Sequence, residues 1–110
     1  MTLKNIIYAG ALTLLTHASI ADTVWLDVRS PSEFASGHIT GAVHLPHTAV
    51  AKQAATLLPN KDDEILVYCR SGGRAGKAES ALKGLGYLNV KNIGGLDDAK
   101  KLKQSKYDIQ

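Results

Sequence analysis

A single cysteine stands in this sequence of 110 residues, and the residues around it could make it reactive. Cys69 follows the apolar run Ile65–Tyr68 and precedes the short loop Arg70–Arg74, which leads into a helix-forming segment. A thiol is a strong nucleophile only as its thiolate, so a loop that stabilises negative charge would activate this residue. The chemistry to consider is therefore nucleophilic attack by Cys69 on a small electrophile.

The loop after Cys69 has the composition of an anion-binding site. Gly72 and Gly73 permit backbone angles that turn successive N–H groups inward, and the following helix adds free N–H groups and a positive dipole end. Arg70 and Arg74 add positive charge that does not titrate near neutral pH. We therefore expect a lowered thiol pKa and at least one arginine in contact with substrate; a buried, inert thiol is the alternative that these residues disfavour. The candidate substrate-binding residues are Arg70, Ser71, Gly72, Gly73 and Arg74.

Two further groups of residues are expected to support this loop and not to react. Asp27 and Arg29 follow the first apolar run of the domain, and Gly94-Gly95 follows the last. Arg29 precedes Glu33 by one helical turn, which predicts an ion pair between them. The two glycines predict a close approach of backbone segments beside the pocket.

Three histidines are candidate metal ligands, namely His38, His44 and His47. Their spacing matches no common zinc signature. We therefore predict no metal and no organic cofactor, because a thiolate nucleophile requires neither.

The segments that must position Cys69 alternate between strand and helix patterns. Strands are expected at residues 24–28, 42–45, 65–68 and 88–93, and helices at 31–36, 47–58, 75–85 and 96–104. The first helix carries a capping box formed by Ser30 and Glu33. Strands that alternate with helices join by right-handed crossovers, so we predict one α/β domain with a mainly parallel sheet of roughly four to five strands and helices on both faces. Ligands bind at the carboxyl ends of such strands, where Cys69 lies.

Residues 1–21 have the pattern of a secretory signal peptide. Lys4 precedes an apolar run from Ile6 to Leu15, and small residues precede the expected cleavage after Ala21. The run is shorter than the roughly 20 residues of a membrane-spanning helix, so we expect no stable membrane anchor. We predict export to the periplasm and a mature domain of residues 22–110.

The net charge and the cysteine content limit the possible partners and covalent links of the chain. The formal net charge is +3 and the basic residues are scattered, which does not favour a nucleic-acid partner. A lone cysteine excludes an internal disulfide. We expect a monomer whose partners are small molecules.

The strand, cysteine, loop and helix around Cys69 resemble the active site of the rhodanese-domain sulfurtransferases. Further segments of residues 22–110 match the pattern of that family, and they are Asp27-Val28-Arg29, Glu33-Phe34, Gly37-His38-Ile39, Gly41-Ala42, Leu45-Pro46, Gly86-Tyr87 and Gly94-Gly95. The resemblance implies that Cys69 takes a sulfur atom from thiosulfate as a persulfide and passes it to cyanide or a thiol. It also implies that the backbone from Arg70 to Arg74 cradles the transferred sulfur.

Two other functions remain as alternatives. Cysteine-dependent phosphatases and arsenate reductases also place a thiolate in an anion-binding loop that ends in arginine, but the loop between Cys69 and Arg74 is one residue shorter than theirs. A short loop suits a persulfide, while a tetrahedral oxyanion needs a wider ring of donors. The second alternative is a non-catalytic rhodanese module that senses sulfur or binds a partner.

Overall fold

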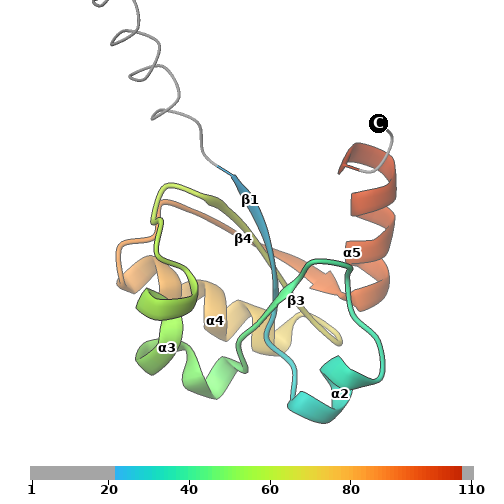
Figure 1. Cartoon of the computed structure of the whole chain (residues 1–110), viewed down its shortest axis with the longest axis horizontal. Helices are drawn as coiled ribbons and strands as arrows, with labels where there is room; N and C mark the ends of the chain where they lie inside the picture. The colour runs from blue at the N-terminus through green and yellow to red at the C-terminus, as the bar shows by residue number, and fades with distance from the viewer. Residues whose placement is uncertain (1–21, 108–110) are drawn as a thin grey trace, which may run out of the picture.

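The structure, a computed structural model, describes residues 22–107. The strands are β1 (Thr23–Asp27), β2 (Val43–His44), β3 (Glu64–Cys69) and β4 (Asn89–Gly95). The helices are α2 (Pro31–Ala35), α3 (Val50–Leu57), α4 (Gly73–Gly84) and α5 (Leu96–Leu102), with the 3₁₀ turn η1 (His47–Ala49) before α3 and the π-helical turn η2 (Lys103–Tyr107) after α5 (Figure 1). The predicted signal peptide, residues 1–21, lies outside the described residues.

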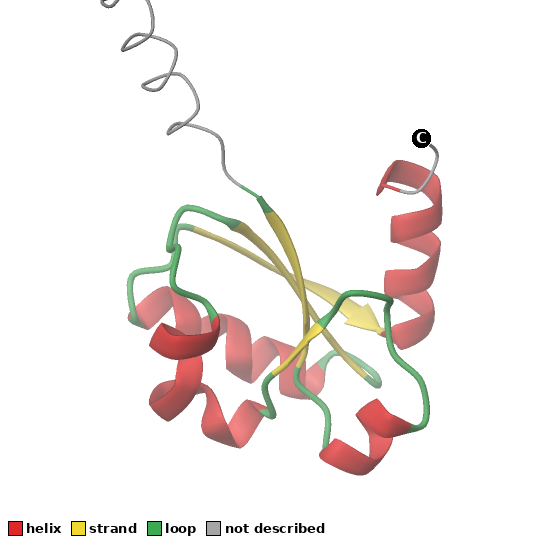
Figure 2. Ribbon diagram, in the orientation of Figure 1, coloured by secondary structure: helices red, strands yellow, loops and turns green. Residues whose placement is uncertain are grey.

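The strands form one parallel sheet in the order β2-β1-β3-β4. The central strands β1 and β3 are in register from Thr23 opposite Glu64 to Asp27 opposite Tyr68. Their apolar runs are buried on both faces, as in parallel sheets that helices cover from two sides. The predicted α/β domain with a mainly parallel sheet is therefore confirmed. Figure 2 shows the strands with α3 and α4 on one side and α5 on the other.

Side chains of β3 alternate between two hydrophobic clusters, because successive strand residues point to opposite faces. Ile65, Val67 and Cys69 belong to the larger cluster, which α3 and α4 cover with residues such as Ala54 and Leu82. The smaller cluster lies on the other face under α5, and its buried members are Trp25, Ile39, Leu66, Tyr68 and Ala99. Cys69 therefore points to the side of the sheet on which α4 begins.

Several element boundaries differ from those predicted, and three of these differences change how the loop and the edge of the sheet are built. The helix expected at 75–85 begins at Gly73, because Gly72 adopts a left-handed φ of 101° and acts as its N-cap. The helix expected at 47–58 begins as the 3₁₀ turn η1 and becomes α-helical only at Val50. Strand β2 is limited to Val43–His44, which alone pair with Leu26 and Asp27 of β1. The earlier start of α4 brings its first N–H groups next to Cys69.

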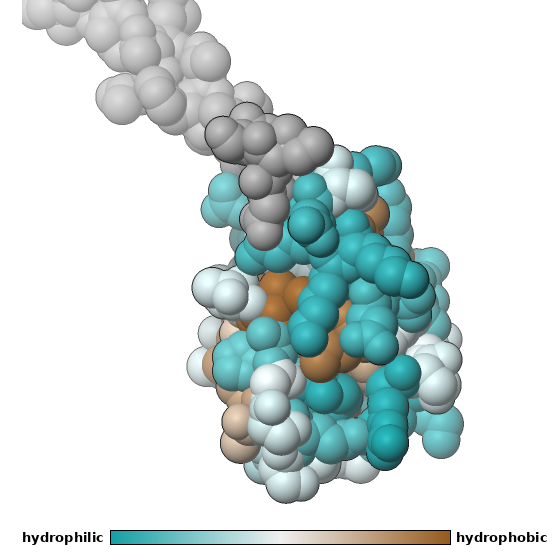
Figure 3. All heavy atoms as spheres, turned by 90° about the vertical axis from the view of Figure 1, so that its right-hand side faces the viewer, coloured by the Kyte–Doolittle hydropathy of each residue, from teal (hydrophilic) through white to brown (hydrophobic). Residues whose placement is uncertain are grey.

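The surface on the α5 side is mainly hydrophilic. Figure 3 shows this side, where hydrophilic residues surround a smaller apolar area. Within residues 22–107, none of the helices combines the length and the apolar character needed to span a bilayer.

Candidate active site

Cys69 is the last residue of β3 and is buried, with 1% of its surface exposed. Its Sγ accepts hydrogen bonds from the backbone N–H groups of Gly72 at 2.9 Å and Ala75 at 3.4 Å. Burial raises the pKa of the thiol, but backbone N–H groups, led by those of Ala75 and Gly72, outweigh it and lower the pKa overall. The loop and the first turn of α4 thus form a ring of donors that favours the thiolate.

Glycines allow the loop to close on this sulfur. Gly72 lies in the left-handed region that side chains disfavour, and this conformation aims its N–H at Sγ. Gly95 of β4 pairs with Cys69 beyond a bulge that follows Val67. A Cβ atom on Gly95 would overlap the carbonyl oxygen of Arg70. Only glycine therefore allows β4 to lie so close to the loop.

Asn92 braces the loop from β4. Its Nδ2 donates to the Gly72 carbonyl at 2.9 Å, and its Oδ1 accepts the Gly94 N–H at 2.9 Å. One side chain thus connects two glycines in left-handed conformations. Asn92 was not among the predicted site residues, and the only sign of it in the sequence is its position shortly before Gly94-Gly95.

Arg74 is bound by Glu33 of α2. The guanidinium and the carboxylate form a bidentate ion pair, with Nη1 to Oε1 at 2.6 Å and Nη2 to Oε2 at 3.0 Å. This pairing holds the pKa of the Glu33 carboxyl well below its usual range and raises the pKa of Arg74. The expected Arg29–Glu33 ion pair is wrong, because Glu33 turns toward the loop and Arg29 turns toward Asp27. Arg74 therefore braces the loop against α2.

Asp27 and Arg29 form a buried ion pair at the end of β1. Arg29 Nη2 lies 2.7 Å from Asp27 Oδ2 and also donates to the Gly37 carbonyl at 2.6 Å. Hydrogen bonding to Asp27 raises the pKa of Arg29 against the opposing effect of burial. The pair ties β1 to the segment after α2 and leaves neither charge uncompensated.

A cleft of ≈ 620 Å³ opens beside the loop, and its charged lining residues are Arg29, Glu33, Arg70, Asp97 and Asp98. Arg70 is exposed, and in the described part of the chain its guanidinium has no hydrogen bond or ion pair. Of the two loop arginines, Arg70 is thus the one available to a ligand.

Two of the three histidines considered as metal ligands have structural contacts. His38 and His44 stack on the two sides of Phe34, with centroid distances of 3.7 and 4.4 Å. His38 Nδ1 lies 2.8 Å from the Phe34 carbonyl oxygen, and His44 Nε2 lies 2.8 Å from that of Arg29. His47 starts η1. His38 and His44 thus pack against Phe34 of α2.

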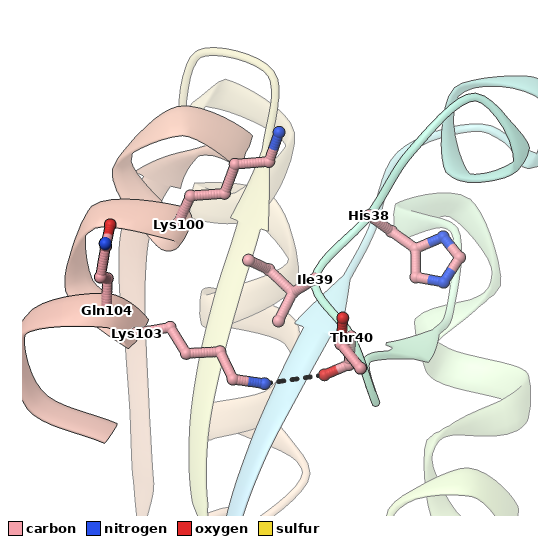
Figure 4. Close-up of a pocket in the computed structure, with 6 residues that line it drawn as sticks. All are labelled: His38, Ile39, Thr40, Lys100, Lys103 and Gln104. Carbon is pink, nitrogen blue, oxygen red and sulfur yellow. Dashed lines mark hydrogen bonds between the residues drawn. The ribbon is translucent and has the colours of Figure 1, made fainter. Parts of the chain in front are cut away.

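A second cleft, of ≈ 430 Å³, lies between the segment that follows α2 and the C-terminal helix. In Figure 4, Lys103 reaches across it to donate to the Thr40 carbonyl at 2.8 Å, while the His38 ring points away from the lysines. No residue of the Cys69 loop lines this cleft. It is separate from Cys69 and its loop.

Known proteins are similar to this chain in sequence and in fold. Residues 11–101 match the family described as the rhodanese-like domain. Thiosulfate sulfurtransferase PspE from Escherichia coli is 40% identical over 74 residues, which cover 67% of this chain and 71% of that protein. Thiosulfate sulfurtransferase GlpE from Pseudomonas entomophila is 39% identical over 92 residues, covering 84% and 79%. A solved structure described as a rhodanese with anions from E. coli has a TM-score of 0.66 at 39% identity, over 69% of this chain and 89% of that one. The chain thus belongs to the rhodanese-like domain family.

Proposed function

We propose that this protein is a thiosulfate sulfurtransferase in which Cys69 carries the transferred sulfur as a persulfide. The observation that carries the proposal is the ring of backbone N–H groups around Cys69 Sγ, which stabilises an anionic sulfur without a second side chain. The two relatives named thiosulfate sulfurtransferase support the choice of substrate.

In the first step the Cys69 thiolate attacks the outer sulfur of thiosulfate. A new S–S bond forms at Sγ, the S–S bond of thiosulfate breaks, and its electron pair leaves with sulfite. Total charge is unchanged, because the thiolate and thiosulfate become an anionic persulfide and sulfite. The new terminal sulfur lies about 2.05 Å from Sγ, within the space that the loop N–H groups surround.

The two loop arginines have different tasks in this step. Arg70 binds the oxygen atoms of thiosulfate, because its planar guanidinium suits them and it has no partner among the described residues. Arg74 keeps the loop in position through its ion pair with Glu33. Donor binding thus depends directly on Arg70 and only indirectly on Arg74.

In the second step an acceptor, cyanide or a thiolate, attacks the terminal sulfur. The persulfide S–S bond breaks, and its electron pair returns to Cys69, which leaves as the stabilised thiolate. The sulfur moves between partners with no net oxidation, so neither step requires a metal or an organic cofactor.

Mass spectrometry of the protein tests this mechanism. Incubation with thiosulfate, followed by removal of the donor, should leave a mass increase of one sulfur atom, and cyanide should discharge it as thiocyanate. Cys69→Ser should retain the fold by circular dichroism and lose both the adduct and the turnover, because a hydroxyl is a far weaker nucleophile. Thiocyanate formation by the serine variant would contradict the role of Cys69.

The alternative functions predict different results. A phosphatase or arsenate reductase needs its arginine to bind the oxyanion, whereas Arg74 is held by Glu33 at 2.6 Å. Such an enzyme would hydrolyse an aryl phosphate or reduce arsenate. A non-catalytic module would form no sulfur adduct, although its thiol would still be accessible to small reagents after unfolding.

We also infer that the protein is exported, that cleavage follows Ala21, and that the mature domain is a monomer. Strand β1 begins at Thr23, so a chain that starts at Asp22 retains every described element. Intact mass of the protein from the periplasmic fraction should correspond to residues 22–110, and sedimentation should give the mass of one chain. A full-length protein in the cytosol would contradict export.

A further inference from the structure

Asn92 is an exposed residue of an edge strand, yet both ends of its side-chain amide make hydrogen bonds to the backbone. Asparagine is depleted in strands, so strand formation does not account for it. Between its pairs with Val67 and Cys69, β4 contains two residues where β3 contains one. Asn92 therefore stands at the start of a bulge, and bulges commonly redirect the chain beside active sites.

The first of the two hydrogen bonds shapes the bulge itself. Asn92 Oδ1 accepts the N–H of Gly94, two residues later, at 2.9 Å, which is the geometry of an Asx turn. Gly94 has a left-handed φ of 95°, so this turn contains the extra residue of β4. A Cβ atom on Gly72 would lie 3.7 Å from the Cα atom of Gly94. The bulge therefore lies directly against the loop at Gly72.

The second hydrogen bond holds the loop residue that donates to the sulfur. Asn92 Nδ2 donates to the Gly72 carbonyl at 2.9 Å, and the Gly76 N–H of α4 donates to the same oxygen at 2.9 Å. The Gly72 N–H in turn donates to Cys69 Sγ at 2.9 Å. Glycine adopts other conformations as readily as a φ of 101°, so contacts with the rest of the protein must select this one. Asn92 thus fixes one end of Gly72, and the other end points at the sulfur.

We propose that Asn92 is a positioning residue of the transfer reaction, which acts through Gly72 to keep the N–H of that residue directed at Cys69 Sγ. The inference rests on the proposed sulfurtransferase function and adds a residue that supports both of its steps. In the first step the N–H favours the thiolate that attacks thiosulfate, and in the second it favours Cys69 as the leaving group. The Gly72 N–H is among the backbone groups that lower the pKa of Cys69 against the effect of burial.

Titration of the thiolate absorbance tests this role without any sulfur transfer. The chain has one cysteine, so the signal reports Cys69 alone. Asn92→Ala removes both hydrogen bonds, whereas Asn92→Asp keeps an acceptor for the Gly94 N–H and loses the donor to the Gly72 carbonyl. We expect the midpoint to rise by about half a unit to one unit in both variants, since one hydrogen bond is worth roughly that change.

A double-mutant cycle tests whether Asn92 acts through Gly72. Gly72→Ala disturbs the same N–H directly, so a second substitution at Asn92 has little left to remove. The rise of the midpoint in the Gly72→Ala, Asn92→Ala double variant should therefore be smaller than the sum of the two single rises. Additive rises would overturn the proposal, because the two residues would then act on Cys69 independently.

Both steps of sulfur transfer should respond to Asn92→Ala, each with its own pH dependence. Below the thiolate midpoints of wild type and variant, the variant should take sulfur from thiosulfate about three to ten times more slowly, in proportion to its thiolate fraction. Above both midpoints the loading rate should approach that of wild type. Discharge of a preformed persulfide by cyanide should stay slower across the pH range, because a more basic thiolate is a poorer leaving group.

Asn89→Ala is the matched control, because Asn89 is an exposed asparagine at the other end of β4 and its amide has no hydrogen bond within residues 22–107. It should change neither the thiolate midpoint nor the two rates, and circular dichroism should show that every variant is folded. An unchanged midpoint in folded Asn92→Ala and Asn92→Asp, or an equal rise in Asn89→Ala, would overturn the role of Asn92. Failure of the wild type to form any sulfur adduct would instead overturn the sulfurtransferase function, and the thiolate titration would still show whether Asn92 acts on Cys69.

Discussion

At the scale of single residues, the reactivity of Cys69 depends on backbone groups more than on charged side chains. Gly72 and Ala75 donate to Sγ directly, whereas Arg74 is engaged with Glu33. The sulfur is therefore stabilised by groups that cannot titrate. Such stabilisation persists at any pH at which the fold persists.

The ionisation of Cys69 should show this dependence on the backbone. Thiolate absorbance in the ultraviolet reports Cys69 alone, because the chain has one cysteine. The titration midpoint should lie below that of free cysteine, because the backbone N–H groups lower the pKa of Cys69, and it should rise in Gly72→Ala, whose left-handed conformation costs about 1–2 kcal/mol. Cys69→Ser provides the blank. A midpoint that does not move in Gly72→Ala would show that its N–H is not the important donor.

The Glu33–Arg74 pair should contribute to stability in a pH-dependent way. The pKa of the Glu33 carboxyl is depressed in the folded state, so the contribution is complete above the unfolded value of about 4.3 and is lost as pH falls further. In urea at neutral pH, Glu33→Gln should lower the free energy of unfolding by about 1 kcal/mol. The difference from wild type should shrink below about pH 4.

Glu79 provides the comparison for this pair, because its partner Lys83 is 57% exposed and lies one turn away on the same helix, α4. Glu79→Gln should cost less than about 0.5 kcal/mol. Equal losses in the free energy of unfolding of Glu33→Gln and Glu79→Gln would mean that the Glu33 ion pair does not stabilise the loop.

At the scale of elements, the ends of β3 and β4 and the start of α4 form one joint around Cys69. Gly95 contacts the Arg70 backbone, and Asn92 holds the Gly72 carbonyl. The loop is therefore fixed by β4 on one side and by the first turn of α4 on the other. Displacement of either element would move the N–H donors away from Sγ.

Gly95→Ala tests this joint. The added methyl group would overlap the Arg70 carbonyl, so we expect a loss of about 1–3 kcal/mol in the free energy of unfolding and at least a tenfold fall in thiocyanate formation. Gly84→Ala at the end of α4 is the control, because a Cβ there meets nothing within 4 Å. Full activity in Gly95→Ala would show that the loop tolerates displacement.

The sequence predicted these elements better than it predicted their contacts. Apolar runs located the strands, and the capping box of Ser30 and Glu33 located α2, since both signals are local. The Arg74–Glu33 pair joins residues far apart in the chain, so helix spacing pointed to Arg29 instead. The role of Asn92 arises only when β4 lies beside the loop, and no local pattern indicates it.

At the scale of the whole molecule, Cys69 lies at the end of a central strand of the sheet. Cys69 ends β3, which β1 and β4 flank, and hydrophobic clusters cover both faces. The edge strands β2 and β4 are less buried than the central strands β1 and β3. This arrangement gives the loop a rigid base.

The described domain should fold without residues 1–21. Every element from β1 onward lies within residues 22–107, and Trp25, the only tryptophan of the chain, is 7% exposed in β1. A chain that begins at Asp22 should unfold in urea in one transition, with tryptophan fluorescence and circular dichroism changing together. Noncoincident transitions would indicate that the sheet requires the missing segment.

The lone thiol also determines the kinetic form of the reaction. Since the chain has no second cysteine, a persulfide on Cys69 cannot be resolved into an internal disulfide. In the proposed mechanism the sulfur therefore stays on Cys69 until an acceptor arrives. Donor and acceptor must alternate in ping-pong order, so double-reciprocal plots at several acceptor concentrations should be parallel, and the loaded protein serves as a stoichiometric store of sulfane sulfur.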